Sequence, residues 1–103
     1  MLGQSNPAAT TATTLYTVPS ATDTVASTMT VANLGASSAT FRIAVRPAGA
    51  TLAAVHYIAY DVTIAGLDTL TLTLGLTLDT TDVVTVFAST ATIAFHLYGA
   101  EIA

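Results

Sequence analysis

The sequence predicts an all-β protein: one antiparallel β-sandwich or jelly-roll-like domain over residues 15–103, preceded by an extended N-terminal arm over residues 1–14. Three observations predict this fold. Threonine and leucine alternate over residues 69–74, which in an extended chain places the two residue types on opposite faces. Alternation of the same period recurs in about seven short segments, and turn-forming residues separate the segments roughly every 8–12 residues.

The stretch of residues 68–87 carries the clearest pattern. Leu70, Leu72 and Leu74 fall on one face of a strand, whereas a helix would spread them around its circumference. Threonine is β-branched and suits a pleated surface better than a helix interior. Gly75 interrupts the alternation, residues 79–82 supply turn-forming side chains, and residues 82–87 resume an extended pattern, so we expect strand, turn and strand.

The N-terminal third opens with small polar residues that show no periodicity, and Pro7 disfavours a helix or a central strand there. Residues 1–14 are therefore expected to form the arm. Residues 15–18 predict a short strand that ends before Pro19, and residues 24–33 predict a longer one. In the longer strand, alternation assigns one face to Val25, Ser27, Met29 and Val31 and the other to Ala26, Thr28 and Thr30.

Two further strands are expected in the middle of the chain. Residues 39–46 place Phe41, Ile43 and Val45 inward and Thr40, Arg42, Ala44 and Arg46 outward, a clean alternation that favours an antiparallel sheet. Residues 55–64 assign one side to Ile58, Tyr60, Val62 and Ile64 and the other to Tyr57, Ala59, Asp61 and Thr63. A helix over residues 52–59 is a weaker alternative, because it would disperse the large apolar side chains.

The last predicted strand, residues 92–99, carries bulky side chains on both faces. Alternation points Ile93, Phe95 and Leu97 one way and Ala94, His96 and Tyr98 the other. We expect such a strand to lie between its own core and a neighbouring subunit. His96 and Tyr98 are therefore candidate interface residues.

The composition is unusual for its lack of charge. Charged residues make up 8% of the chain, against about 25% in typical proteins, and the net charge is −4 with no lysine. This shortage of cationic groups argues against nucleic acid as a partner, and no apolar run of about 20 residues predicts a membrane span. A surface poor in lysine and glutamate is typical of subunit interfaces, so we expect a homo-oligomer.

No pattern predicts an enzyme or a bound cofactor. The sequence has no cysteine, and no G-x-S-x-G nucleophile motif accompanies the two histidines, His56 and His96. Members of a catalytic triad can lie far apart in a sequence, but the missing local signature favours structural roles for both histidines.

Asp79 and Asp82 allow two interpretations. Their carboxylates could bind calcium together with loop carbonyls, or they could accept hydrogen bonds from the amides of a turn. The turn interpretation is favoured because the loop lacks the D-x-D-x-D-G spacing of calcium-binding loops. Asp61 and Asp68, which flank Gly66, are interpreted in the same way, so no metal site is expected.

Arg42 and Arg46 lie on the same face of one predicted strand, about 13 Å apart at about 3.3 Å per residue. Because acidic residues outnumber them, each arginine is expected to pair with a carboxylate. The partner could lie within the subunit or across an interface, where the planar guanidinium favours bidentate pairing. A solvated strand face is the equal alternative.

Five segments carry a resemblance to a known family: LGQSNPAATTATTLYTVPS at residues 2–20, TVANLGASSATFRIAVRPAG at 30–49, HYIAYD at 56–61, LTLDTTDVVTVFAST at 76–90 and FHLYGAEI at 95–102. Through these segments, which extend over the full length of the chain, the sequence resembles small virion proteins of tailed bacteriophages and prophages. The shared motifs are structural, and none is a catalytic signature.

This resemblance implies a virion structural protein, in the first place a trimeric capsid decoration (cement) or accessory subunit that binds the major capsid protein or tail proteins. A tail position, at the neck, baseplate or fibre, is the alternative. The arm could lie across a neighbour or add a strand to its sheet. A host-surface carbohydrate-binding module is a further alternative, with Tyr57, Tyr60, Tyr98 and Asp61 as candidate sugar contacts.

Overall fold

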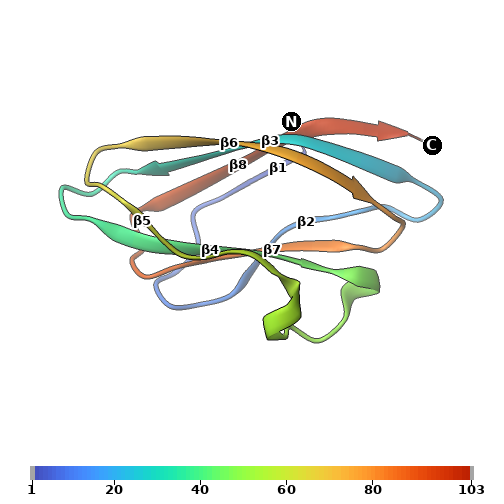
Figure 1. Ribbon diagram of the computed structural model, residues 1–103, viewed down its shortest axis with the longest axis horizontal. Helices are drawn as coiled ribbons and strands as arrows, with labels where there is room; N and C mark the ends of the chain where they lie inside the picture. The colour runs from blue at the N-terminus through green and yellow to red at the C-terminus, as the bar shows by residue number, and fades with distance from the viewer. Residues whose placement is uncertain (1, 103) are drawn as a thin grey trace.

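A computed structural model of the chain describes residues 2–102 and contains two four-stranded antiparallel sheets stacked as two layers (Figure 1). In spatial order, sheet A consists of β1 (Gly3–Ser5), β8 (Ile93–Ile102), β3 (Asp23–Asn33) and β6 (Thr69–Leu78). Sheet B consists of β2 (Thr13–Thr17), β7 (Val83–Ala88), β4 (Ala39–Arg46) and β5 (Tyr57–Ile64). Two single 3₁₀ turns, η1 (Pro47–Gly49) and η2 (Ala54–His56), lie between β4 and β5. The predicted all-β class is confirmed, and the arrangement is sandwich-like.

The strands form nested antiparallel pairs. β4 pairs with β5, β3 with β6, β2 with β7 and β1 with β8, while β3–β8 and β4–β7 pairing joins these pairs into sheets. Consecutive strands therefore lie in different sheets, except for β4 and β5. The strand, turn and strand predicted over residues 68–87 are confirmed as β6 and β7, and the turn between them carries the chain from sheet A to sheet B.

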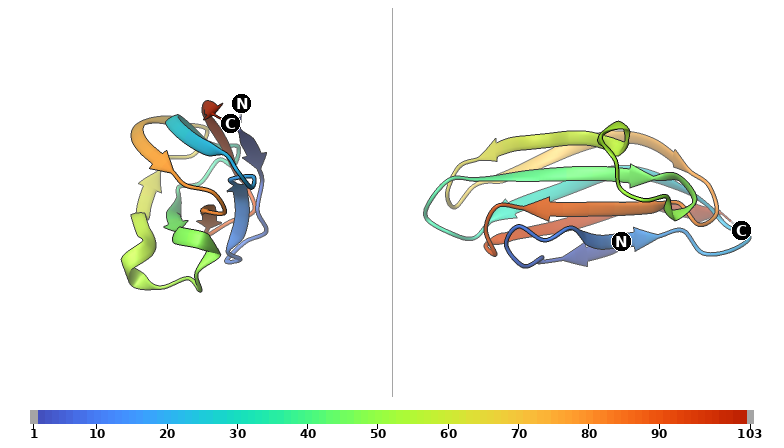
Figure 2. Two further views of the ribbon diagram at one scale, coloured as in Figure 1. Left: turned by 90° about the vertical axis from the view of Figure 1, so that its right-hand side faces the viewer. Right: turned by 90° about the horizontal axis from the view of Figure 1, so that it is seen from below.

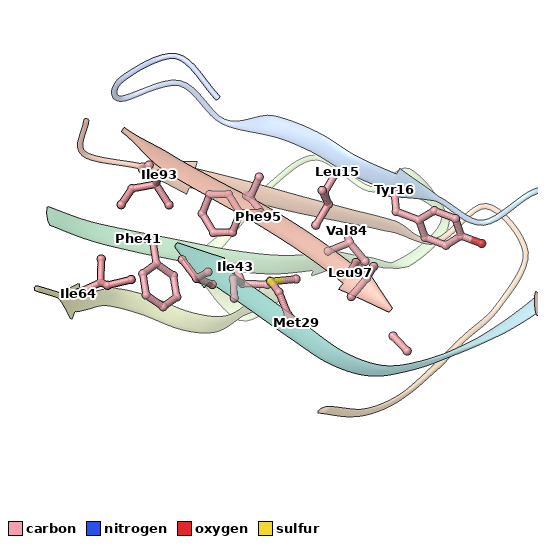
Figure 3. Packing of buried hydrophobic residues seen from close by; sticks show 14 of the residues in the cluster. Leu15, Tyr16, Met29, Phe41, Ile43, Ile64, Val84, Ile93, Phe95 and Leu97 are labelled. Atoms are coloured by element: carbon pink, nitrogen blue, oxygen red, sulfur yellow. The ribbon is translucent and has the colours of Figure 1, made fainter. Parts of the chain in front are cut away.

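The hydrophobic core lies between the two layers and draws on both (Figure 3). Phe41 of β4 and Phe95 of β8 meet edge to face between the layers, with ring centroids 6.0 Å apart. The inward faces predicted for residues 39–46 and 92–99 are confirmed, with Val45 only half-buried. Fully buried side chains on these two faces are Phe41, Ile43, Ile93, Phe95 and Leu97.

The segment predicted as an arm lies along its own subunit in this single chain. Gly3–Ser5 forms β1, which was not predicted, and pairs with β8 at the edge of sheet A. The Asn6 side-chain amide donates to the Ile93 carbonyl at 2.7 Å, and the Thr10 amide donates to the Ala88 carbonyl at 2.8 Å. An arm that reaches a neighbouring subunit stays a prediction, and Met1, its first residue, lies outside the described residues.

The face assignment predicted for residues 24–33 is wrong over the first half of that strand. Met29 and Val31 are buried as expected, but Ala26 is buried and Val25 is 40% exposed. The cause is a bulge, because the pairing of β3 with β8 shifts by one residue between Ala26 and Thr28. An extra residue in one strand reverses the side-chain alternation beyond it. Before Ser27 the even-numbered residues therefore point inward, and after it the odd-numbered residues do.

A second bulge makes the assignment predicted for residues 55–64 wrong before Asp61, whereas the predicted burial of Ile64 and exposure of Thr63 are confirmed. Ile43 pairs with Ala59 and Phe41 with Val62, so β5 has one residue more than β4 between these pairs. Asp61 lies in this interval with a φ of 50°, in the left-handed region. Tyr60, expected in the core, is 58% exposed as a result, and Ile58 is 46% exposed. The helix considered for residues 52–59 is limited to the single turn η2.

Gly75 does not end its strand. β6 runs through it to Leu78, and the register between β6 and β3 shifts near this glycine. The alternation itself is confirmed: the threonines of β6 are exposed, and its leucines are half-buried or buried.

Candidate functional site

The four predicted interface residues occupy two different surfaces. Arg42 and Arg46 lie on the outer face of sheet B, where they are aligned with Phe87 and Val83 of β7. His96 and Tyr98 lie on the outer face of sheet A. Because the two sheets pack through their inner faces, these two outer faces point away from each other, and the four residues do not form one site.

On sheet B, Arg42 is the centre of a polar and aromatic cluster. Its Nε donates to Asp61 Oδ1 at 2.6 Å and its Nη2 to Asp61 Oδ2 at 3.3 Å, a bidentate pair within the subunit. The guanidinium carbon lies 4.2 Å from the ring centroid of Tyr60 and 4.4 Å from that of Phe87. The hydrogen bond that Arg42 donates to the Asp61 carboxylate raises the pKa of Arg42 above its ordinary value. The bulge in β5 makes this cluster, because it turns Tyr60 outward.

A depression of about 590 Å³ adjoins the cluster. Tyr57 and Tyr60 form one wall, with their rings edge to face and their centroids 4.9 Å apart. The other wall comes from the β4–β5 connection and consists of Leu52, Ala53 and Ala54. His56 fixes this connection locally, since its Nδ1 accepts a hydrogen bond from the Ala53 amide at 3.1 Å.

Arg46 has no carboxylate partner among residues 2–102. Its Nε donates to Thr85 Oγ1 at 3.0 Å and its Nη1 to the Ala50 carbonyl at 3.1 Å. These bonds hold the chain after η1 against the outer face of sheet B. The carboxylate pairing predicted for the two arginines therefore occurs at Arg42, and the role of Arg46 is to position a connection.

The outer face of sheet A carries a regular grid of uncharged side chains, most of which are threonine or alanine. Strand register places nine residues in three rows across β8, β3 and β6. We call this surface the threonine face; its rows are Ala94–Ala32–Thr69, His96–Thr30–Thr71 and Tyr98–Thr28–Thr73. At ordinary strand spacings the grid measures about 14 Å by 10 Å. No member is acidic or carries a lysine or arginine charge, whereas sheet B presents Arg42, Asp61 and Arg46.

The acidic turn is used by the fold. Asp82 accepts a hydrogen bond from the Asp79 amide at 2.9 Å, so the turn interpretation is confirmed for Asp82, and it accepts a second from the Ala48 amide of η1 at 2.9 Å. The turn interpretation is not confirmed for the Asp79 carboxyl, which has a different partner. The Asp79 carboxyl lies against Asp23 at the start of β3, and a hydrogen bond between them, followed by charge repulsion, raises the pKa of Asp79. Asp68 accepts a hydrogen bond from the Thr69 amide at 2.8 Å. Residues 2–102 contain no cluster of three or more His, Asp or Glu side chains suited to a metal ion.

Sequence reasoning missed two contributions to these surfaces. The sequence predicts a strand that contains Phe87, but it does not predict that Phe87 contacts Arg42. That contact depends on the register between β4 and β7, which places the two residues opposite each other. The threonines of the threonine face were recognised as one face of a strand and not as part of a surface shared with β3 and β8. The T-x-T spacing of residues 28–30 and 69–73 is the sequence pattern that could have indicated this shared surface.

No protein-family profile, curated protein or solved structure matches the chain. Over residues 2–102, no helix has the length and apolar character needed to cross a membrane.

Proposed function

We propose that this chain is a non-enzymatic structural subunit that binds other proteins through the outer face of sheet A. More particularly, we propose a virion protein of a tailed bacteriophage or prophage, in the role of a capsid decoration (cement) or accessory subunit. A position at the neck, baseplate or fibre of the tail is the alternative. The resemblance of residues 2–102 to such virion proteins directs the proposal to phage particles.

The strand order supports this class. We infer that the fold is a jelly roll, because eight strands arranged as 1-8-3-6 and 2-7-4-5 with nested antiparallel pairs correspond to a double-sheet jelly roll. Such folds are frequent in viral capsid proteins and in lectins. Fold analogy alone does not assign a function, which depends on the residues of the surface.

The observation that carries the proposal is the uncharged threonine face. Interfaces are depleted in lysine, glutamate and aspartate at their centre, and this face has none of these residues and carries Tyr98 at one corner. Threonine and alanine lose little side-chain entropy when they are buried, in contrast to lysine or glutamate. Docking a neighbour here would therefore bury no unpaired charge and order few flexible side chains.

The test is to locate the chain on particles and then disable the face. We expect an antibody against the chain to label the virion, over the capsid for decoration or at the tail for the alternative. Unlabelled virions would overturn the proposal.

The double variant Thr30→Glu with His96→Glu should bind particles at least about tenfold more weakly, since it buries two charges. Thr14→Glu, on an exposed site of sheet B, is the matched control and should bind as the wild type does.

A second candidate function is carbohydrate binding at the Arg42 cluster. The observation that favours it is the exposure of Tyr60 beside Tyr57 in the wall of the depression, with Arg42 of the Arg42–Asp61 pair stacked on the Tyr60 ring. Aromatic rings can stack on the apolar faces of sugars while the ion pair bonds hydroxyl groups. Tyr98 lies on the opposite sheet and does not contribute. A glycan array probed with wild type and Tyr60→Ala decides this candidate: binding that the variant loses supports it, and no binding dismisses it.

A further inference from the structure

The four sheet edges are protected very unequally. β1 has three residues, and β2 has five residues with a bulge between Thr14 and Tyr16. β5 is bulged and carries Asp61 with its ion pair to Arg42. Short length, bulges and charge are the usual devices that stop an edge strand from pairing with another chain.

β6 has almost none of these devices. It is a ten-residue edge strand of threonine, leucine and one glycine, without charge or proline. Its pairing with β3 is regular from Thr69 to Thr73, ahead of the register shift near Gly75. The outward-facing amides and carbonyls of this stretch are a template for one more antiparallel strand.

An apolar depression runs beside this edge. It has a volume of about 400 Å³ and is lined by residues of β5 and β6. These two strands face each other on one flank of the two layers (Figure 2). Leu72 and Leu74 line it from β6, and Ile58 and Val62 line it from β5. The flank thus combines unpaired backbone groups with half-buried side chains that gain from further burial.

We propose that the occupant of this edge is a second copy of the chain, paired through β6 about a two-fold axis near Thr71. The sequence of β6 is self-complementary in this arrangement. An antiparallel partner centred on Thr71 places Thr69 opposite Thr73 and Leu70 opposite Leu72, so that threonines meet threonines on the outer face and leucines meet leucines inside. A shift by a single residue would set leucine against threonine on both faces.

The pairing has consequences for the whole assembly. Sheet A becomes continuous across the axis, the threonine faces of the two copies join, and the two apolar depressions are brought together at the same flank. The contact is isologous and closes as a dimer, not as the trimer expected from the sequence resemblance. It does not depend on the chain being a virion protein.

Single cysteines test the geometry cleanly, because the chain has none of its own. Under mild oxidation we expect Thr71→Cys to form disulfide-linked dimers, since its side chains face each other at the axis. Thr77→Cys should form far fewer disulfide-linked dimers, because position 77 of one subunit would lie about 40 Å from position 77 of the other. Thr63→Cys on the β5 edge is the matched control. Linkage of Thr71→Cys no greater than that of Thr63→Cys would overturn the proposal.

An edge-blocking variant gives an independent measurement. Thr71→Lys places two ammonium groups against each other at the axis and should raise the dimer dissociation constant at least about tenfold. Thr63→Lys should leave it unchanged. Sedimentation equilibrium measures both, and circular dichroism checks that each variant is folded. A wild-type chain that sediments as a monomer or as a trimer would contradict the two-fold contact.

Discussion

Tyr16 is the residue that ties the two sheets together at one end of the core. From β2 its hydroxyl donates to Glu101 of β8 and lies 2.9 Å from Thr24 Oγ1 of β3. Burial raises the pKa of the Tyr16 hydroxyl, and Glu101 adds to the rise, so the phenol remains a donor well above neutral pH. Thr24 is fully buried and has no access to water as a substitute partner.

Replacing Tyr16 by phenylalanine should therefore lower the free energy of unfolding by about 1–3 kcal/mol, because it leaves the buried Thr24 hydroxyl without this partner. Urea denaturation measures the change. Tyr98→Phe is the control and should be within about 0.5 kcal/mol of wild type, since Tyr98 is exposed on the threonine face. Equal losses from the two substitutions would contradict the inter-sheet role.

The Asp23–Asp79 carboxyl pair predicts a pH dependence with a definite sign. The raised folded-state pKa of Asp79 means that the shared proton stabilises the fold below the ordinary value of 3.8, and that this contribution is lost as pH rises through the folded-state pKa. At neutral pH the two carboxylates repel each other. Asp79→Asn removes that repulsion, so its melting temperature should exceed that of wild type near neutral pH.

The advantage of Asp79→Asn should shrink as the pH falls through the raised folded-state pKa of Asp79, and it should be gone below the ordinary value of 3.8. Thermal melts of both proteins across this range measure the trend. Asp68→Asn is the control, because the Asp68 carboxylate accepts a hydrogen bond from the Thr69 amide and should gain nothing on losing its charge. A constant difference between Asp79→Asn and wild type would refute the shared proton.

At the scale of elements, two glycines of sheet A have opposite surroundings. A Cβ on Gly99 of β8 would lie 2.1 Å from the Val25 carbonyl oxygen, a backbone atom beside the β3 bulge. A Cβ on Gly75 of β6 would meet nothing within 4 Å. The two positions thus test whether close strand approach at the bulge requires glycine.

Gly99→Ala should lower the free energy of unfolding by about 1–3 kcal/mol, because the backbone of β3 or β8 has to move. Gly75→Ala should be neutral or stabilise the protein by about 0.4–1 kcal/mol, because alanine restricts the unfolded chain. Chemical denaturation of both variants provides the comparison, and a tolerated Gly99→Ala would show that the bulge is more open than the structure indicates.

The elements also show what sequence alone can predict. Seven of the eight strands follow from side-chain alternation, because a strand with one buried face repeats every two residues whatever its partners are. β1 was missed because three residues are too few for any period. The inward assignment of Tyr60 failed because one inserted residue near Asp61 reverses parity without a local sequence signal. The Arg42 cluster was likewise beyond prediction, since it joins three strands whose register is set by distant contacts.

At the scale of the whole molecule, residues 2–10 behave as part of the fold. The Leu2 amide donates to the Leu97 carbonyl at 2.7 Å, and Asn6 donates to the carbonyls of Ala91 and Ile93 at 3.0 and 2.7 Å. Pro7 is buried. In a single subunit this segment covers the edge of β8 that would otherwise be open.

Deletion of residues 1–6 should accordingly lower the free energy of unfolding by at least about 2 kcal/mol, through the lost hydrogen bonds, and the melting temperature by roughly 10 °C. Differential scanning calorimetry measures this. Gln4→Ala is the control, because it keeps the backbone pairing of β1 and removes only an exposed side chain. An unchanged melting temperature after the deletion would instead fit a free arm that contacts a neighbour.

The nesting of strand pairs also bears on how the protein is made in the cell. β4 and β5 are adjacent in the chain and can pair with each other soon after translation. Each of the other nested pairs forms later, because its two strands are further apart in sequence. β1 is the last to pair, since its partner β8 is the last strand to leave the ribosome. At about 5–20 residues per second that delay is on the order of ten seconds. The newborn N-terminal segment, rich in threonine and nearly without charge, must stay unpaired and soluble through this interval.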